Sequence, residues 1–173
     1  MPVEDSTFTP LTEAIGRPLT WRRTGLRRYQ LVDDEDRRYG TLELGGFVWV
    51  RGELSTAHGR WRIVTRGWFR PTTEAYAPSG DAPAAVMRVG WLLRGTLALA
   101  SGARYRFLPG FASDSLGLAH AFVTDEDEPV ARFAHRLWFR DRFVLERDTG
   151  PEEASLLAGL GEFTVLLMRH RSR

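Results

Sequence analysis

Apolar and polar residues alternate with a period of two along most of this chain, in short runs that end at glycine or acidic residues. The clearest runs cover residues 29–32, 39–44, 47–50, 61–64, 85–89, 97–99, 105–107, 121–123 and 142–145. Such runs are typical of strands with one face in a core, and their spacing is typical of a sandwich or barrel. We expect roughly eleven or twelve strands, too many for one flat two-layer sheet in a chain of this length. The pattern therefore predicts a mainly β fold, a closed antiparallel barrel of about 12 strands.

Helical patterns stand near both ends of the sequence. A threonine cap and a proline in the first turn predict a short helix over residues 9–16. A proline and two glutamates predict the start of a second helix, over residues 151–169. Its apolar residues circle the helix, and they span less than the roughly 20 residues that a membrane crossing needs, so we expect this helix to be buried in protein. The sequence thus predicts an N-terminal segment, residues 1–18, and one barrel domain, residues 19–173, that includes the second helix.

The composition excludes several kinds of site. The chain has no cysteine, lysine or asparagine, and all 24 of its basic residues are arginine. Disulfides, thiolate metal sites and cysteine nucleophiles are therefore excluded. The arginines reflect either GC-rich codon usage or selection for bidentate phosphate contacts. A net charge of +2 does not favour nucleic acid as a partner, and the acidic N-terminus lacks the apolar run of a secretory signal, so we expect a cytoplasmic protein.

Few residues suggest metal binding or catalysis. Acidic runs at 33–36 and 125–128 could offer oxygen ligands to a hard cation, but neither continues into an EF-hand loop, and solvated hairpin turns are the alternative. The histidines lack the spacing of metal ligands and are expected to be isolated: His58, His120, His135 and His170. Ser113 and Ser115 are not in a Gly-x-Ser-x-Gly elbow. The sequence therefore predicts no catalytic residue, no metal site and no cofactor.

Arginine and aromatic residues alternate in the first half of the chain, where residues 17–70 hold twelve arginines and six acidic residues. In a strand, arginines at alternate positions share one face while the aromatic residues take the other. One interpretation is an ordinary barrel wall, polar outside and aromatic inside. The other is a patch that binds phosphate headgroups or nucleic acid. The eight candidate residues for such a patch are Arg22, Arg23, Arg27, Arg28, Arg60, Arg62, Arg66 and Arg70.

The order of these elements resembles the tubby C-terminal-like superfamily, which includes the phospholipid scramblases and the LURP-one-related proteins. The local resemblance, to the LURP-one-related type, covers about residues 20–170 and rests on residues 95–107, Asp114, the acidic turn at 125–128, the strand at 143–146 and the helix from Pro151. It implies a twelve-stranded barrel threaded by its C-terminal helix, with an association with membranes or lipids. It implies no site residue, because the basic pair of phosphoinositide-binding tubby domains includes lysine and this chain has none. The calcium-binding segment of the scramblases is not recognisable either.

These observations together predict a non-enzymatic binding module for anionic lipid or phosphate-bearing ligands. It would act through the Arg-rich face, in the cytoplasm or peripheral to a membrane, with lipid headgroups or another protein as partner. Two alternatives stay open: a small-molecule enzyme of unknown class, and a protein-interaction or structural domain with no small ligand. A helix that fills the barrel counts against the enzyme, because it leaves no lumen for a substrate.

Overall fold

The computed structural model describes residues 8–46, 51–67, 69–90, 94–110, 119–136 and 140–171. Twelve strands are present: β1 (Pro18–Arg23), β2 (Arg28–Val32), β3 (Arg38–Gly45), β4 (Arg51–Thr56), β5 (Gly59–Arg66), β6 (Thr72–Tyr76), β7 (Ala85–Val89), β8 (Gly95–Leu99), β9 (Arg104–Pro109), β10 (Ala119–Val123), β11 (Pro129–Arg136) and β12 (Arg140–Leu145). Each strand pairs antiparallel with its sequence neighbours, and β1 pairs with β12, so the barrel is closed. The predicted fold class is confirmed; the predicted strand at 47–50 lies outside the described residues.

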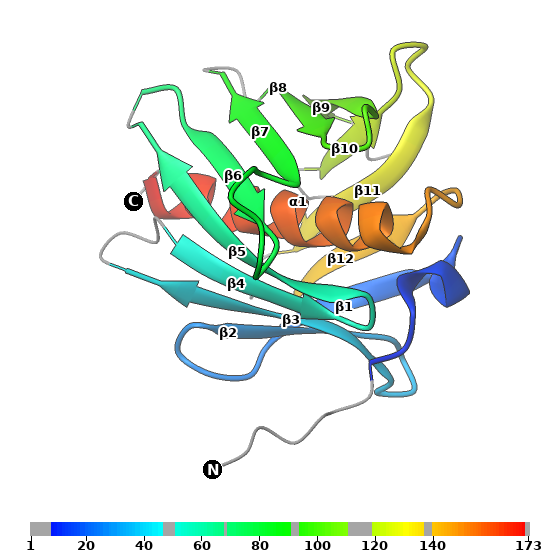
Figure 1. The fold of residues 1–173 in the computed structure, drawn as a ribbon. Helices are drawn as coiled ribbons and strands as arrows, with labels where there is room; N and C mark the ends of the chain where they lie inside the picture. Colours follow the sequence, from blue (N-terminus) through cyan, green and yellow to red (C-terminus); the bar gives the residue numbers. More distant parts are fainter. Residues whose placement is uncertain are drawn as a thin grey trace.

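Strand β5 shows why these residues form a barrel wall. Trp61, Ile63 and Thr65 point inward and are buried, while Arg60, Arg62 and Arg66 at alternate positions are exposed. Aromatic and β-branched side chains favour the extended backbone, and alternation sends every second one into the core. Figure 1 shows the strands arranged around one interior, where the buried hydrophobic residues form a single cluster.

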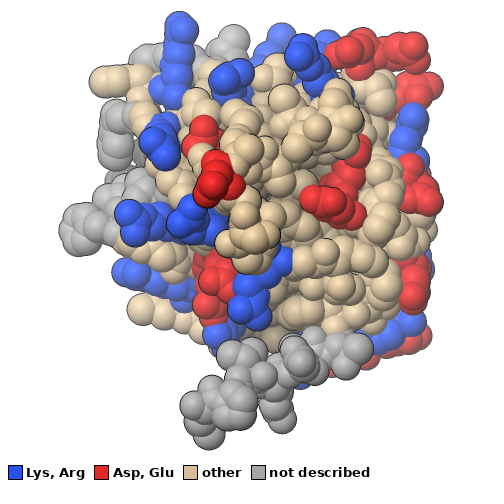
Figure 2. Space-filling model, in the orientation of Figure 1, with Lys and Arg blue, Asp and Glu red and all other residues tan. Residues whose placement is uncertain are grey.

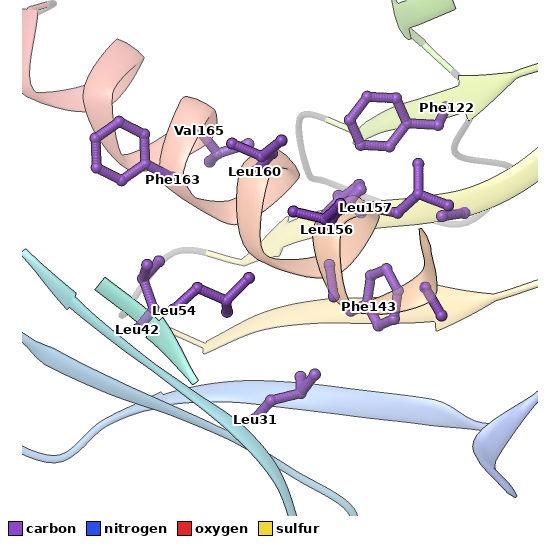
Figure 3. Packing of buried hydrophobic residues seen from close by; sticks show 14 of the residues in the cluster. Leu31, Leu42, Leu54, Phe122, Phe143, Leu156, Leu157, Leu160, Phe163 and Val165 are labelled. Carbon is purple, nitrogen blue, oxygen red and sulfur yellow. The ribbon is translucent and has the colours of Figure 1, made fainter. Parts of the chain in front are cut away.

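Helix α1 (Pro151–Arg171) runs through the middle of the barrel, as Figure 1 shows, and every residue from 154 to 167 is buried. Figure 3 shows α1 side chains among residues of the wall, with Phe163 and Leu160 on the helix and Leu42 and Leu54 on β3 and β4. Two glycines allow this close approach: a Cβ at Gly159 would overlap Leu54, and one at Gly161 would overlap the ring of Phe133. Glycine costs about 1 kcal/mol in a helix interior, so here it is tolerated because wall side chains need the space.

The N-terminal helix is shorter than the pattern predicts. Only a 3-10 turn, η1 (Leu11–Ala14), forms, and it buries Leu11 and Ala14 against α1 and β12. Ile15 already has an extended backbone, and Gly16 takes a φ of 73°, a left-handed conformation that glycine adopts without strain. In the described part of the chain, no helix has both the length and the apolar character needed to cross a bilayer.

Candidate functional site

The two ends of the barrel carry opposite charges. Because successive strands are antiparallel, connections after even-numbered strands lie at the end where α1 begins, and connections after odd-numbered strands lie where it stops. We call the first the acidic end. Its turns and the start of α1 carry Asp34, Glu35, Asp36, Asp125, Glu126, Asp127, Glu128, Glu152 and Glu153. Figure 2 shows arginine gathered toward the side where α1 stops, and acidic residues toward the opposite edge.

The other end, which we call the basic end, presents arginines that are exposed and have no carboxylate partner among the described residues. These are Arg27, Arg51, Arg70, Arg88, Arg94 and Arg140. The described connections at this end are residues 24–27, 46, 67, 69–71, 90, 94 and 110, and none of these residues is acidic. Of the exposed arginines that form no ion pair with a described residue, six therefore lie at the basic end, compared with Arg17, Arg38 and Arg104 at the acidic end.

Two large apolar side chains are also exposed at the basic end. Leu26, in the turn between β1 and β2, is 79% exposed, and Phe69, in the turn between β5 and β6, is 73% exposed. Each precedes an arginine in the sequence, Arg27 and Arg70. Among the described residues one other large apolar side chain is exposed, Ile15 at 37%, and it lies at the acidic end. Strongly exposed apolar side chains and unpaired arginines therefore occur together.

A hollow of about 290 Å³ opens at the basic end beside Phe69. Its lining is Arg70, Pro71, Thr72, Arg88, Val89 and Gly90. Thr72 on β6 lies directly opposite Arg88 on β7, and Arg70 lies in the turn two residues before Thr72. Two guanidinium groups and a hydroxyl are groups that bind phosphate oxygens.

The structure spreads the eight predicted arginines over two regions separated by β3 and β4. Four of them pair with carboxylates on the outer wall: Arg22 with Asp36 at 2.8 Å, Arg28 with Glu43, Arg60 with Glu53 at 3.5 Å, and Arg66 with Glu74 at 3.6 Å. Arg62 lies over the ring of Tyr76, and Arg23 donates to the carbonyl oxygens of Gly25 and Leu26. Arg27 and Arg70 belong to the basic end. Six of the eight therefore have internal partners.

The wall arginines form part of a row across the outside of the barrel. Arg28, Glu43, Glu53, Arg62 and Tyr76 are direct neighbours in register on β2 to β6. Opposite charges on neighbouring strands stabilise a sheet by a few tenths of a kcal/mol per pair and neutralise one another. The alternation of arginine with aromatic residues is thus largely the polar face of a wall. Sequence reasoning missed Arg51, Arg88, Arg94 and Arg140, which could have been found by asking which charges follow odd-numbered strands.

The acidic runs at 33–36 and 125–128 are hairpin turns of one type. The Asp33 carboxylate accepts hydrogen bonds from the N–H groups of Glu35 and Arg37, at 3.0 and 2.9 Å. Thr124 accepts from Glu126 and Glu128 in the same two positions. Asp36 and Asp127 have φ of 60° and 64°. Among the described residues no cluster of three histidine, aspartate or glutamate side chains is arranged to hold a metal ion.

A buried polar cluster lies inside the barrel toward the basic end, between β10, β11, β12 and α1. Nδ1 of His120 is 3.2 Å from Nε2 of His135, and Nδ1 of His135 is 3.2 Å from Oδ1 of Asp141. Arg169 donates two hydrogen bonds to the Asp141 carboxylate, at 2.7 and 2.8 Å. Glu162, two helical turns before Arg169, is fully buried beside the Asp141 carboxyl, and its carboxyl oxygens accept no hydrogen bond from a described residue.

The charges of this cluster follow from burial and from its neighbours. Burial, and then the nearby Asp141, raise the pKa of Glu162 well above its ordinary value, which favours the protonated, neutral carboxyl. Burial would also raise the pKa of Asp141, but contacts with His135 and Arg169 outweigh it and lower that pKa. Burial, and then the proximity of His135 and of the Arg169 guanidinium, lower the pKa of His120 to about 4. Asp141 and Arg169 therefore form an ion pair at the centre of this cluster.

This cluster corrects one expectation, that the histidines are isolated. His120 and His135 come from neighbouring strands and both point inward, an arrangement that spacing within the sequence does not reveal. His120 is 2% exposed and Asp141 is 1% exposed, so a substrate in solution cannot reach them. The cluster joins α1 to the wall at β12. The other two histidines, His58 and His170, are exposed, and Ser113 and Ser115 lie outside the described residues.

Comparisons with known proteins do not identify the chain. No family model, no curated protein and no solved structure matches it. What the chain binds has to be inferred from its own two charged ends and its buried cluster.

Proposed function

We propose that this protein is a non-enzymatic binding module that attaches to anionic, phosphate-bearing ligands through the basic end of its barrel. The observation that carries the proposal is the presence at that end of six exposed arginines that have no carboxylate partner among the described residues, with no acidic residue in its described turns. Elsewhere on the wall, arginines such as Arg28 are neutralised by neighbours on the next strand. A ligand with phosphate oxygens would supply anionic partners that the described residues do not provide at this end.

The hollow beside Phe69 gives this end a place for one phosphate group. Arg70 in the β5–β6 turn and Arg88 on β7 line it, and Thr72 adds a hydroxyl. Guanidinium groups bind phosphate oxygens in a bidentate manner, with charge-assisted hydrogen bonds. The remaining arginines of the basic end attract an anionic surface over a Debye length of about 8 Å at physiological salt.

A catalytic role receives less support from the same structure. The side chains with perturbed pKa values that could act in catalysis, His120 and Asp141, are buried beside a helix that fills the barrel. A closed antiparallel barrel around its final helix is also the architecture that the resemblance to the tubby C-terminal-like superfamily implies. We include a relationship to that superfamily, and a cytoplasmic location peripheral to a membrane, in the proposal.

The proposal is tested by removing equal charge from the two ends. The double variant Arg70→Gln/Arg94→Gln removes two arginines from the basic end. The matched control Arg38→Gln/Arg104→Gln removes two exposed arginines that lie at the acidic end and likewise form no ion pair with a described residue. Binding to inorganic polyphosphate and to anionic vesicles is measured at low and physiological salt.

At about 1 kcal/mol for each arginine near an anionic surface, the first variant should lose about 30-fold in affinity at low salt. The control should stay close to the parent protein. Equal losses in both variants, or no preference of the parent for anionic over neutral vesicles, would contradict the proposal.

A further inference from the structure

The basic end carries exposed apolar side chains beside its arginines. Binding of a soluble anion would not require these apolar side chains. Leu26 and Phe69 are the two most exposed large apolar side chains of the described chain, and they occupy different turns at this end. The wall arginines Arg28 and Arg62, by contrast, each lie directly opposite a glutamate on the next strand and have no exposed large apolar residue beside them. Exposed apolar residues beside basic ones are typical of surfaces that enter the headgroup region of a bilayer.

We propose that the partner of the basic end is an anionic lipid bilayer, on which the barrel stands with Leu26 and Phe69 inserted among the headgroups. This inference rests on the proposed function and names its ligand as a surface rather than a free anion. Leu26 and Phe69, the two membrane anchors, lie on separate turns with β3 and β4 between their hairpins. Two separated anchors keep the end of the barrel parallel to the membrane surface. Arg27 and Arg70, each next to an anchor in sequence, then lie at the level of the lipid phosphates.

The charges of the two ends favour the same orientation. Acidic residues of the turns at 33–36 and 125–128 lie at the far end of the barrel, where an anionic membrane would repel them. Attraction at one end and repulsion at the other turn the molecule so that its basic end meets the lipid first. Nucleic acid fits this end less well, because Phe69 could stack on a base but Leu26 could not.

The first experiment compares lipid with a soluble anion. The variant Leu26→Ser/Phe69→Ser is measured against vesicles of phosphatidylserine and phosphatidylcholine and against inorganic polyphosphate. The matched control is Ile15→Ser, which alters the exposed apolar residue at the acidic end. We expect the double variant to lose at least tenfold in vesicle affinity while its binding to polyphosphate stays within about twofold of the parent, and Ile15→Ser to change neither.

The second experiment reports insertion directly. Because the chain has no cysteine, Leu26→Cys, Phe69→Cys and Ile15→Cys each create one labelling site for a polarity-sensitive fluorophore. Adding anionic vesicles should shift the emission to the blue for labels at 26 and 69 and leave the label at 15 unchanged.

The outcomes separate this inference from the function on which it rests. If the parent binds polyphosphate but vesicle binding does not depend on Leu26 and Phe69, the membrane inference is wrong and the proposed function stands. If the parent binds neither ligand, the proposed function itself fails. Tighter binding to a single-stranded oligonucleotide than to vesicles, lost in Phe69→Ser, would replace the bilayer with nucleic acid.

Discussion

Glu162 allows a sharp test of the charges inside the barrel. Its side chain is fully buried, neither carboxyl oxygen accepts a hydrogen bond from a described residue, and Asp141 and Arg169 are its charged neighbours. Its pKa is therefore raised, so the folded protein keeps the proton while the unfolded chain releases it above the ordinary value of 4.5. A carboxyl whose pKa is raised on folding contributes stability below its unfolded pKa, and this contribution is lost as pH rises toward the folded pKa.

The variant Glu162→Gln has nearly the same shape and cannot ionise. Above pH 4.5, the parent should lose about 1.4 kcal/mol of unfolding free energy per pH unit through this group, and the variant should not. The difference, variant minus parent, should therefore rise at that slope until the folded pKa is reached. Burying the unpaired amide adds a constant cost of about 1–3 kcal/mol, which shifts the curve without changing its slope.

The assay is urea unfolding of both proteins between pH 5 and pH 8, followed by tryptophan fluorescence and circular dichroism. Glu126→Gln, on an exposed turn, is the control and should follow the parent within about 0.5 kcal/mol. If Glu162 were ionised in the folded protein and paired with Arg169, Glu162→Gln would destabilise increasingly as pH rises. A difference that falls or stays flat with pH would therefore refute the assignment of a neutral Glu162.

Two further predictions concern packing and acid stability. Gly161→Ala places a Cβ on the ring of Phe133 and should lower the unfolding free energy by about 1–3 kcal/mol, whereas Gly45→Ala, with open space around it, should leave stability nearly unchanged in the same denaturation assay. His120→Phe keeps the stack on Phe107 but cannot be protonated. Because the pKa of His120 is lowered from 6.5 to about 4, the parent should lose about 2 kcal/mol relative to this variant as pH falls from 7 to 5, and equal pH profiles would show that His120 does not carry the effect.

Whether a strand can be predicted from the sequence depends on the size of the side chains that it turns toward α1. Strands with bulky inward residues, such as β5 with Trp61 and Ile63, follow directly from the alternating pattern. β4 and β6 do not, because their inward residues include Gly52, which faces the ring of Phe163, and Ala75. Where the helix fills the barrel, the side chains that the wall turns inward have to be small. Small residues contribute little to the alternation of hydrophobic and polar positions from which a strand is predicted.

The two charged ends could not be predicted from the sequence because they depend on the topology of the barrel. Grouping charges by position in the chain combines Arg27 with Asp34, which lie at opposite ends of the barrel because β2 separates them. The buried pair of His120 and His135 escapes for a related reason, since their contact crosses two paired strands and has no characteristic spacing. Both features depend on tertiary pairing, which a single sequence with a local period of two does not specify.

Closure of the barrel also sets how the chain must fold. The seam pairs Pro18 with Val144, so the last ladder cannot form until almost the whole described chain has been brought together. Contacts between residues so distant in sequence slow folding, and all-β chains of high contact order fold in milliseconds to seconds. Until the seam forms, β1 and β12 are edge strands without a partner. The core side chains that α1 later covers are then exposed to solvent. Those intermediates are prone to intermolecular pairing, so the yield of refolding should depend on protein concentration even though the finished barrel offers no edge to a neighbour.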